Sequence, residues 1–185
     1  MSTLEIIATI STILCVWLTG KNNILCWPAG IISALSLIGA YVQTGMYAQI
    51  TLQTVFFIQA IIGWYNWAKP DGLIIISIKK SRIVMDLISF VALGCLFAGW
   101  DVIHNDKIAL LPSYLDGISA SIALLANWYL TKKIIEAWPL FVIYNSVLAA
   151  VLFTQGLYLL VGLNIFLVVI SINSFIKWKR DLQTV

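Results

Sequence analysis

Residues 17–30 read WLTGKNNILCWPAG, and residues 128–141 read WYLTKKIIEAWPLF. Both segments hold a tryptophan, a lysine and a Trp-Pro pair at the same spacing, and the offset between them is 111 positions. At this offset residues 4–67 align with residues 115–178 without a gap, and further residues match: Gly45 with Gly156, Tyr47 with Tyr158, and Trp67 with Trp178. Chance alignment of apolar segments pairs leucine with isoleucine easily, but not three tryptophans in one ungapped register. We therefore interpret the chain as an internal duplication.

The composition places this duplication in a membrane. Of 185 residues, 61% are hydrophobic and 10% are charged, whereas a soluble domain carries roughly 25% charged residues. One domain of this length cannot bury so much apolar surface in its own core, so the surplus must face hydrocarbon. Residues 1–5 lack the basic region that begins a cleaved signal peptide, and we expect the first apolar run to be retained.

Seven apolar runs are each close to the roughly 17–25 residues with which a helix spans a bilayer. They cover residues 4–20, 25–43, 48–67, 83–100, 114–131, 138–153 and 157–177. The prediction is an all-α integral membrane protein with seven transmembrane helices in a 3+1+3 arrangement. Residues 1–67 form the first three-helix repeat, residues 68–113 a linker with the fourth helix, and residues 114–185 the second repeat. Because the copies start four crossings apart, they form parallel repeats around a central crevice.

The basic residues predict how the chain is oriented. Ten of the eleven lie in alternate connecting segments or after the last apolar run, and only Lys107 lies on the other side. The positive-inside rule therefore predicts that the N-terminus is outside and the C-terminus is in the cytoplasm.

The sequence offers little chemistry for an enzyme. The one histidine, His104, lies in a predicted loop, and no Ser/His/Asp or His/Glu cluster falls on a helix. The three cysteines lack metal-binding spacing and are interpreted as packing residues. A retinal protein would need a lysine half-way along its last helix, but Lys177 and Lys179 lie at the end of that run. We therefore expect no catalytic site, metal or cofactor, no nucleic acid partner, and a surrounding of membrane lipid.

Neutral amide side chains lie inside the apolar runs. Burying polar groups in the membrane costs free energy, so polar residues found there usually have a structural or functional role. The simplest reason is that they join one helix to another, which stabilises such interfaces by roughly 0.6–2 kcal/mol. So many amides in a duplicated bundle also suit the binding of an uncharged or weakly charged polar solute. The amides that we place in a substrate site are Gln53, Gln59, Asn127, Asn145 and Asn164.

The two repeats differ on the helix over residues 138–153. Three of its residues share one face, because they are spaced i, i+3 and i+7, namely Trp138, Phe141 and Asn145. Their equivalents in the first repeat are Trp27, Gly30 and Ala34. One copy is thus bulky where the other is small, which predicts that a flat ligand stacks on the bulky face. Tyr144 follows the same trend, whereas Trp138 also fits an aromatic belt at the membrane interface.

Three motifs carry a family resemblance. They are Trp27-Pro-Ala-Gly30, the run from Gly45-Met-Tyr47 to Gly63-Trp-Tyr-Asn-Trp67, and Trp138-Pro-Leu-Phe141-Val-Ile-Tyr144-Asn145. Together they resemble the PnuC-type vitamin transporters over nearly the whole chain. The resemblance implies facilitated diffusion of nicotinamide riboside or, in the PnuT branch, thiamine across the bacterial cytoplasmic (inner) membrane, with trapping by intracellular phosphorylation. It also implies a homo-oligomer, a trimer.

The motif on residues 138–145 decides which vitamin we expect. The riboside carriers of this family show W-x-x-W-x-x-x-D/N. Trp138 and Asn145 match the first and last positions, but Phe141 replaces the second tryptophan. The resemblance therefore favours thiamine over nicotinamide riboside. Both are flat aromatic cations with hydroxyls, which suit an aromatic face and amides, and Trp64 completes the expected substrate site.

A vitamin uniporter and a non-transporting substrate-capture subunit both remain open. A capture subunit would need an exposed docking surface, and the only clear small-residue stretch, Gly30 to Ala34, lies inside the duplicated core. The uniporter is therefore favoured. No carboxylate suited to a proton relay lies mid-membrane, because Asp86, Glu5 and Asp116 are all near helix starts, and we expect transport without ion coupling.

Overall fold

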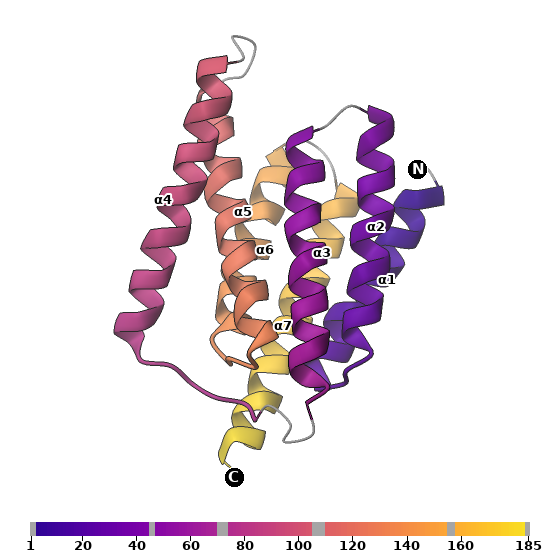
Figure 1. Ribbon diagram of the computed structural model, residues 1–185, viewed down its shortest axis with the longest axis vertical. Coiled ribbons are helices and arrows are strands. Elements are labelled where there is room, and N and C mark those ends of the chain that lie inside the picture. The colour runs from indigo at the N-terminus through magenta and orange to yellow at the C-terminus, as the bar shows by residue number, and fades with distance from the viewer. Residues whose placement is uncertain (1–2, 45–46, 70–73, 105–109, 155–157, 184–185) are drawn as a thin grey trace.

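The computed structural model describes residues 3–44, 47–69, 74–104, 110–154 and 158–183. These residues form seven α-helices that run side by side in one bundle (Figure 1). The helices are α1 (Thr3–Gly20), α2 (Cys26–Thr44), α3 (Tyr47–Trp67), α4 (Lys80–His104), α5 (Leu110–Thr131), α6 (Ala137–Thr154) and α7 (Tyr158–Gln183). The predicted all-α class and the seven helices are confirmed. The last helix continues past residue 177, where the predicted apolar run ends. The prediction stopped early because hydropathy marks the apolar part of a helix and not its polar end.

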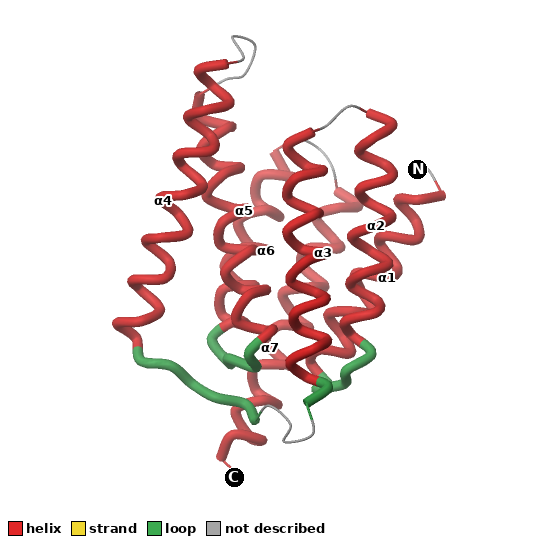
Figure 2. The backbone as a smooth tube through the Cα atoms, viewed as in Figure 1, coloured by secondary structure: helices red, strands yellow, loops and turns green. Residues whose placement is uncertain are grey.

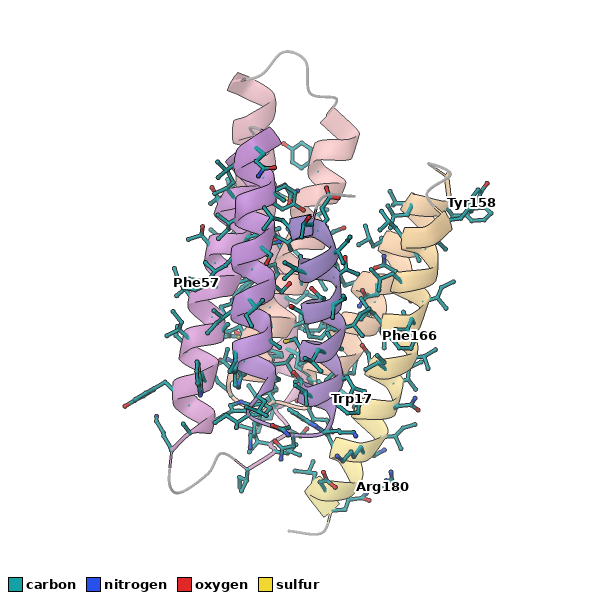
Figure 3. The ribbon with its side chains drawn as sticks, turned by 90° about the vertical axis from the view of Figure 1, so that its right-hand side faces the viewer. Trp17, Phe57, Tyr158, Phe166 and Arg180 are labelled. Carbon is teal, nitrogen blue, oxygen red and sulfur yellow. The ribbon has the colours of Figure 1, made fainter. Side chains whose placement is uncertain are left out.

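The helices have the length and the surface of membrane spans. The shortest have 18 residues, which cover about 27 Å of a hydrocarbon core that is about 30 Å thick. Within the described residues, three segments are both long and apolar enough to cross a membrane, Thr3–Gly20, Cys26–Gln43 and Leu160–Gln183. Large apolar side chains such as Ile10, Val42 and Leu96 are more than 60% exposed, and side chains project outward along the bundle (Figure 3). Such a surface requires lipid around it.

Six of the helices form a closed ring. Each of α1, α2, α3, α5, α6 and α7 contacts the next in this order, and α7 contacts α1. At the 111-residue offset the α1–α7 contact corresponds to the α5–α3 contact, so the two joints between the halves are equivalent. Within the described residues α4 contacts α5 alone and lies outside the ring. The division at residues 67 and 113 stays a prediction, and this contact pattern supports it.

The duplicated loops adopt one conformation. Asn22 and Lys133, which match at the offset, have φ of 56° and 53°. In both loops the N–H of this residue donates to the carbonyl three positions earlier, at 2.9 and 3.0 Å. The next N–H donates to the carbonyl five positions earlier, at 3.0 Å in each loop. This is the Schellman ending, in which a left-handed residue closes the helix, and it leads the chain into α2 and α6.

The segment from residue 74 to 79, which leads into α4, lies against only one of these two loops in the described structure. Ile76 N–H donates to Lys133 O at 3.1 Å, and Ile135 N–H donates to Ile76 O at 3.0 Å. Glu136 Oε1 accepts hydrogen bonds from Ser77 Oγ and from Ile78 N–H, the latter at 3.3 Å. Figure 2 shows this segment and the duplicated loops, in green, at the same end of the bundle. We call residues 74–79 the strap.

Candidate functional site

Trp27 and Trp138 follow the duplicated loops as the second residues of α2 and α6. A proline comes next in both helices, in the first turn, where its missing N–H leaves no hydrogen bond unmade. Each indole packs edge-on against a tryptophan of the third helix in its own repeat. The Trp27 and Trp67 ring centroids are 5.3 Å apart at 87°, and those of Trp138 and Trp178 are 5.4 Å apart at 88°. The two pairs are therefore geometrically equivalent.

These two pairs join into one buried four-tryptophan cluster, Trp27, Trp67, Trp138 and Trp178. The Trp67 and Trp178 centroids are 6.2 Å apart across the boundary between the repeats. Trp138 and Trp178 have no exposed surface, and the other two are at most 7% exposed. Gly63 lies directly against the Trp27 ring, which a Cβ at that position would strike. The cluster closes the ring of helices at the end that carries the duplicated loops.

The four indole N–H groups of the cluster differ in whether they donate a hydrogen bond. Trp67 Nε1 donates to Leu130 O at 3.0 Å. Within the described residues the buried Nε1 atoms of Trp27, Trp138 and Trp178 have no hydrogen-bond partner. A buried donor without a partner costs roughly 1–3 kcal/mol. Three such donors in one cluster are therefore available to a polar group that enters it.

Lysines from the duplicated loops lie over tryptophan rings. Lys21 Nζ is 3.6 Å from the Trp17 centroid, and the matched Lys132 Nζ is 4.4 Å from the Trp128 centroid. Lys133 differs from its counterpart, because it is only 8% exposed and its Nζ lies 4.6 Å from the centroid of Trp67. Burial lowers the pKa of the Lys133 ammonium, since removal from water disfavours the charged form. Lys133 thus lies next to the cluster and is held by a cation–π contact with Trp67.

Two of the predicted amides meet between the repeats. Asn127 Nδ2 of α5 donates to Gln59 Oε1 of α3 at 2.7 Å. Gln59 Nε2 in turn donates to Leu124 O at 3.3 Å. Gln59 is 7% exposed, so the pair forms a buried polar bridge at the α3–α5 joint. It is neutral and can exchange its hydrogen bonds for those of a polar ligand.

Two other predicted amides are turned onto their own helices. Asn145 Nδ2 donates to Phe141 O in α6, and Asn164 Nδ2 donates to Leu160 O in α7, both at 2.8 Å. Both residues are buried, at 4% and 6% exposure. Phe141 is half-buried and its ring lies 6.4 Å from that of Trp138. The predicted face of α6 therefore joins an aromatic pair to a buried amide.

The sequence of the chain matches a known protein family. The profile of the family described as "Nicotinamide mononucleotide transporter" matches residues 2–180. The chain belongs to this transporter family. The expected resemblance to the PnuC-type carriers is thus confirmed.

Curated relatives of this family member have related names. The nicotinamide riboside transporter PnuC of Escherichia coli (strain K12) is 24% identical over 204 residues, which cover 96% of this chain and 85% of that protein. The protein of the same name from Shigella flexneri matches to the same extent. Neither is named for thiamine, so the preference for the thiamine branch gains no support.

A solved structure shares the fold. The crystal structure of the vitamin B3 transporter PnuC superposes with a TM-score of 0.77, at 16% identity, over 98% of this chain and 82% of that one. The two proteins therefore share their helical fold over nearly the whole of this chain.

The structure of this family member brings five of the predicted site residues together in two groups. The α6 face brings Trp138, Phe141 and Asn145 together, and Gln59 meets Asn127 at the α3–α5 joint. Gln53 and Tyr144 are half-buried, and Tyr144 makes an interaction of its own. Trp64 is 44% exposed and does not belong to the buried set.

The two small residues of α2 lie in helix packing. A Cβ at Gly30 would lie 3.3 Å from Cys15 Sγ and 3.9 Å from Ala60 Cβ, so this glycine faces α1 and α3. Ala34 is 4% exposed. Their small size fits close contact between helices of the first repeat as well as it fits a ligand.

Sequence reasoning left several residues of this arrangement out of the site. In the sequence Trp27, Trp67 and Trp178 mark the repeat, and Trp27 is also the equivalent of Trp138. The match between these tryptophans is the signal that could predict their packing. Lys133 had no such signal, because its counterpart at the offset is an asparagine.

Proposed function

We propose that this family member carries nicotinamide riboside across the bacterial cytoplasmic membrane by facilitated diffusion, and that phosphorylation inside the cell traps it. The observation that carries the proposal is the face of α6 that joins the Trp138–Phe141 ring pair to the buried amide of Asn145, in a chain of a transporter family. The names of the curated relatives support this vitamin.

The chemistry of the interior suits such a substrate. Nicotinamide riboside is a flat aromatic cation with a carboxamide and ribose hydroxyls. An aromatic face attracts a cation over its ring, with a free energy of roughly 0.5–2 kcal/mol, and Phe141 and Trp138 offer that face. Asn145, Gln59 and Asn127 would pair with the carboxamide and the hydroxyls, as the polar groups of small-molecule sites do.

Access to this site would require the four-tryptophan cluster to open. Trp138 has no exposed surface in the described conformation, so its ring is covered by its neighbours. A rocking motion of one repeat against the other would separate Trp67 from Trp178, because the contact between these two rings joins the pairs across the repeat boundary. The proposed cycle therefore alternates between a closed and an open cluster at the cytoplasmic end, with the N-terminus outside.

Thiamine is the second candidate, and one residue favours it. Phe141 stands where the riboside carriers are expected to have a second tryptophan. A smaller ring gives a smaller stacking surface, which would change the fit of a nicotinamide more than that of a two-ring ligand.

The test is uptake by purified protein alone in liposomes, with the membrane potential clamped at zero. We expect saturable entry of labelled nicotinamide riboside that stops at equal concentrations and ignores proton and sodium gradients. Thiamine and riboflavin are the competing substrates, and protein-free liposomes are the control. Binding without uptake would indicate a capture subunit, and accumulation driven by either gradient would contradict facilitated diffusion.

A further inference from the structure

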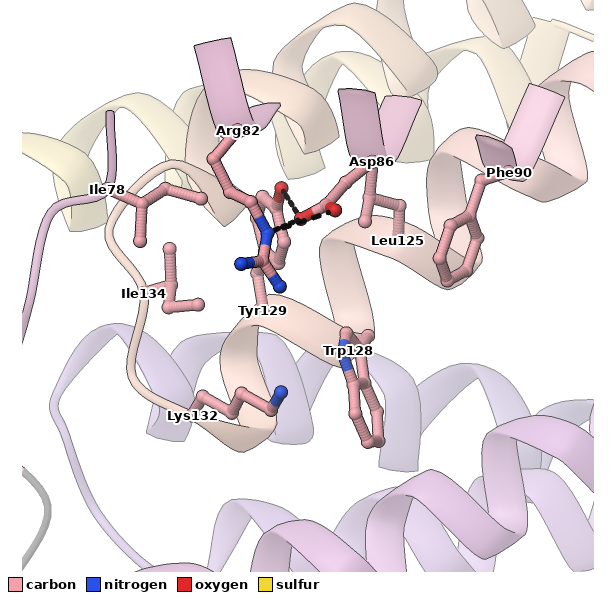
Figure 4. Close-up of a pocket in the computed structure, with 9 residues that line it drawn as sticks. All are labelled: Ile78, Arg82, Asp86, Phe90, Leu125, Trp128, Tyr129, Lys132 and Ile134. Atoms are coloured by element: carbon pink, nitrogen blue, oxygen red, sulfur yellow. Dashed lines mark hydrogen bonds and ion pairs between the residues drawn. The ribbon is translucent and has the colours of Figure 1, made fainter. Parts of the chain in front are cut away.

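A second polar site lies outside the ring, between α4 and α5. The two helices touch closely near the middle of α4, where Gly94 lies against Gly117 O and Ser121 Oγ and has no room for a side chain. Figure 1 shows α4 leaning away from α5 towards its Lys80 end. A pocket of about 240 Å³ occupies the resulting wedge. It is lined by Ile78, Arg82, Asp86, Phe90, Leu125, Trp128, Tyr129, Lys132 and Ile134 (Figure 4).

The charged groups of this pocket are arranged for an anion. Asp86 is already engaged, because Arg82 Nε donates to Oδ1 at 3.2 Å and Tyr129 OH donates to Oδ2 at 2.9 Å. These bonds hold the guanidinium by one edge. Its two terminal nitrogens point away from Asp86, towards the side of the pocket where Lys132 ends (Figure 4). Guanidinium groups held in this way bind the oxygens of a phosphate with two parallel hydrogen bonds.

Lys132 supplies a second cation from the opposite wall. Its Nζ lies 4.4 Å from the centroid of the Trp128 ring, which holds the ammonium at the mouth of the pocket. Two cations and one carboxylate line the pocket, so its formal charge is +1. Lys79 and Lys80 are exposed at the same end of α4 and add to the positive field around it.

Most of the other residues that line the pocket are apolar. Phe90 and Leu125 line it on the side away from Ile78 and Ile134 (Figure 4). On α4 outside the pocket, Val84, Met85 and Ile88 are 53–63% exposed, which gives an apolar surface beside the charged mouth. The volume is smaller than the roughly 300–1,000 Å³ of sites that enclose a whole small ligand. It suits the polar end of a molecule whose remainder lies outside.

We infer that this pocket binds the headgroup phosphate of an anionic phospholipid, with the acyl chains along the exposed face of α4. Basic pockets between transmembrane helices take such headgroups, and nearby lysines and arginines add electrostatic attraction. The lipid would hold α4 against α5 at the end where the helices diverge. This site is separate from the proposed substrate site and does not depend on it.

The experiment is native mass spectrometry of the purified protein in neutral detergent with equal amounts of phosphatidylglycerol and phosphatidylcholine. We expect the wild type to retain phosphatidylglycerol preferentially. Arg82→Gln combined with Lys132→Gln should lower that preference roughly five- to thirtyfold. The control, Lys177→Gln with Lys179→Gln, removes two cations at the same end from α7 and should leave the preference unchanged.

Each remaining outcome decides the proposal. Lys132→Gln alone, at an exposed position, should give a smaller loss and covers the case in which the double variant fails to fold. An unchanged preference in both variants would overturn the inference. Displacement of the lipid by millimolar glycerol 3-phosphate would show that the site binds soluble phosphates and would also overturn the inference. A spectrum in which a second copy of the chain is bound and the lipid is absent would overturn it as well.

Discussion

The indoles of Trp67 and Trp178 pack against each other with their centroids 6.2 Å apart, and the two residues occupy the same position in the two repeats. Matched residues meet in this way only near the axis that relates two copies. Each ring also holds an edge-on partner from its own repeat. The contact between Trp67 and Trp178 therefore lies near the axis that relates the two repeats. We call it the seam, because the two repeats would separate there in the proposed rocking motion.

The first prediction concerns the stability of this seam. Trp178→Ala should lower the free energy of unfolding by roughly 3–5 kcal/mol, because it leaves a cavity in a fully buried cluster. The measurement is thermal unfolding of the purified protein in detergent. Trp17→Ala is the matched control, since this ring is 45% exposed, and it should have a much smaller effect. Equal losses in the two variants would mean that the buried cluster contributes no more to the free energy of unfolding than an exposed tryptophan does.

The second prediction concerns the substrate. Phe141→Ala should weaken nicotinamide riboside binding roughly five- to thirtyfold, because it removes one aromatic face from a cation. Asn145→Leu should also weaken binding, since it removes a buried amide of the same face. Phe153→Ala, on the same helix but 62% exposed, is the control and should bind as the wild type does. Phe141→Trp should raise the affinity for the riboside relative to thiamine, and no change in that ratio would argue against stacking at this position.

Orientation gives the third prediction. Tyr158 and Arg180 lie at opposite ends of α7 (Figure 3). We expect Tyr158→Cys to react with an impermeant maleimide on intact cells. Ser81→Cys, at the other end of the bundle and exposed, should react only after permeabilisation. Both substitutions are made in a background without the three native cysteines. Reaction of Ser81→Cys on intact cells would reverse the proposed topology.

The fourth prediction follows from Lys133. Burial lowers the pKa of its ammonium below the ordinary value, so the unfolded chain binds this proton more tightly than the folded chain does. The folded state should therefore gain stability as pH rises from the lowered pKa towards about 10.5. Lys133→Gln removes this dependence. The check is the difference in melting temperature between wild type and variant from pH 7 to pH 10, and a difference that stays constant with pH would contradict the argument.

Much of the fold was predictable, because both membrane spans and repeats leave a strong signal in the sequence. Apolar runs place the helices, and the match of Trp27-Pro28 with Trp138-Pro139 places the two loops in one register. The polar end of α7 was missed, since charged residues continue a helix into water without any hydropathic signal. The strap was missed for a similar reason, because a short irregular segment has no periodicity.

The candidate site was predictable only in part. The face that joins Phe141 to Asn145 follows from helical spacing alone. Whether an amide bonds to its own helix, as Asn164 does, or to another, as Asn127 does, depends on packing that spacing does not reveal. The α4–α5 pocket was equally hidden, since it arises from the angle at which two helices diverge.

The strap contacts one of the two matched loops and so makes the two halves unequal, although their helices match in sequence. Two backbone hydrogen bonds and the Glu136 carboxylate tether the α5–α6 loop to the chain that enters α4. Within the described residues the α1–α2 loop has no such tether. Under the proposed rocking motion, tilting of the second repeat would drag α4 along or break these bonds. The motion would therefore meet more resistance in the second repeat than in the first.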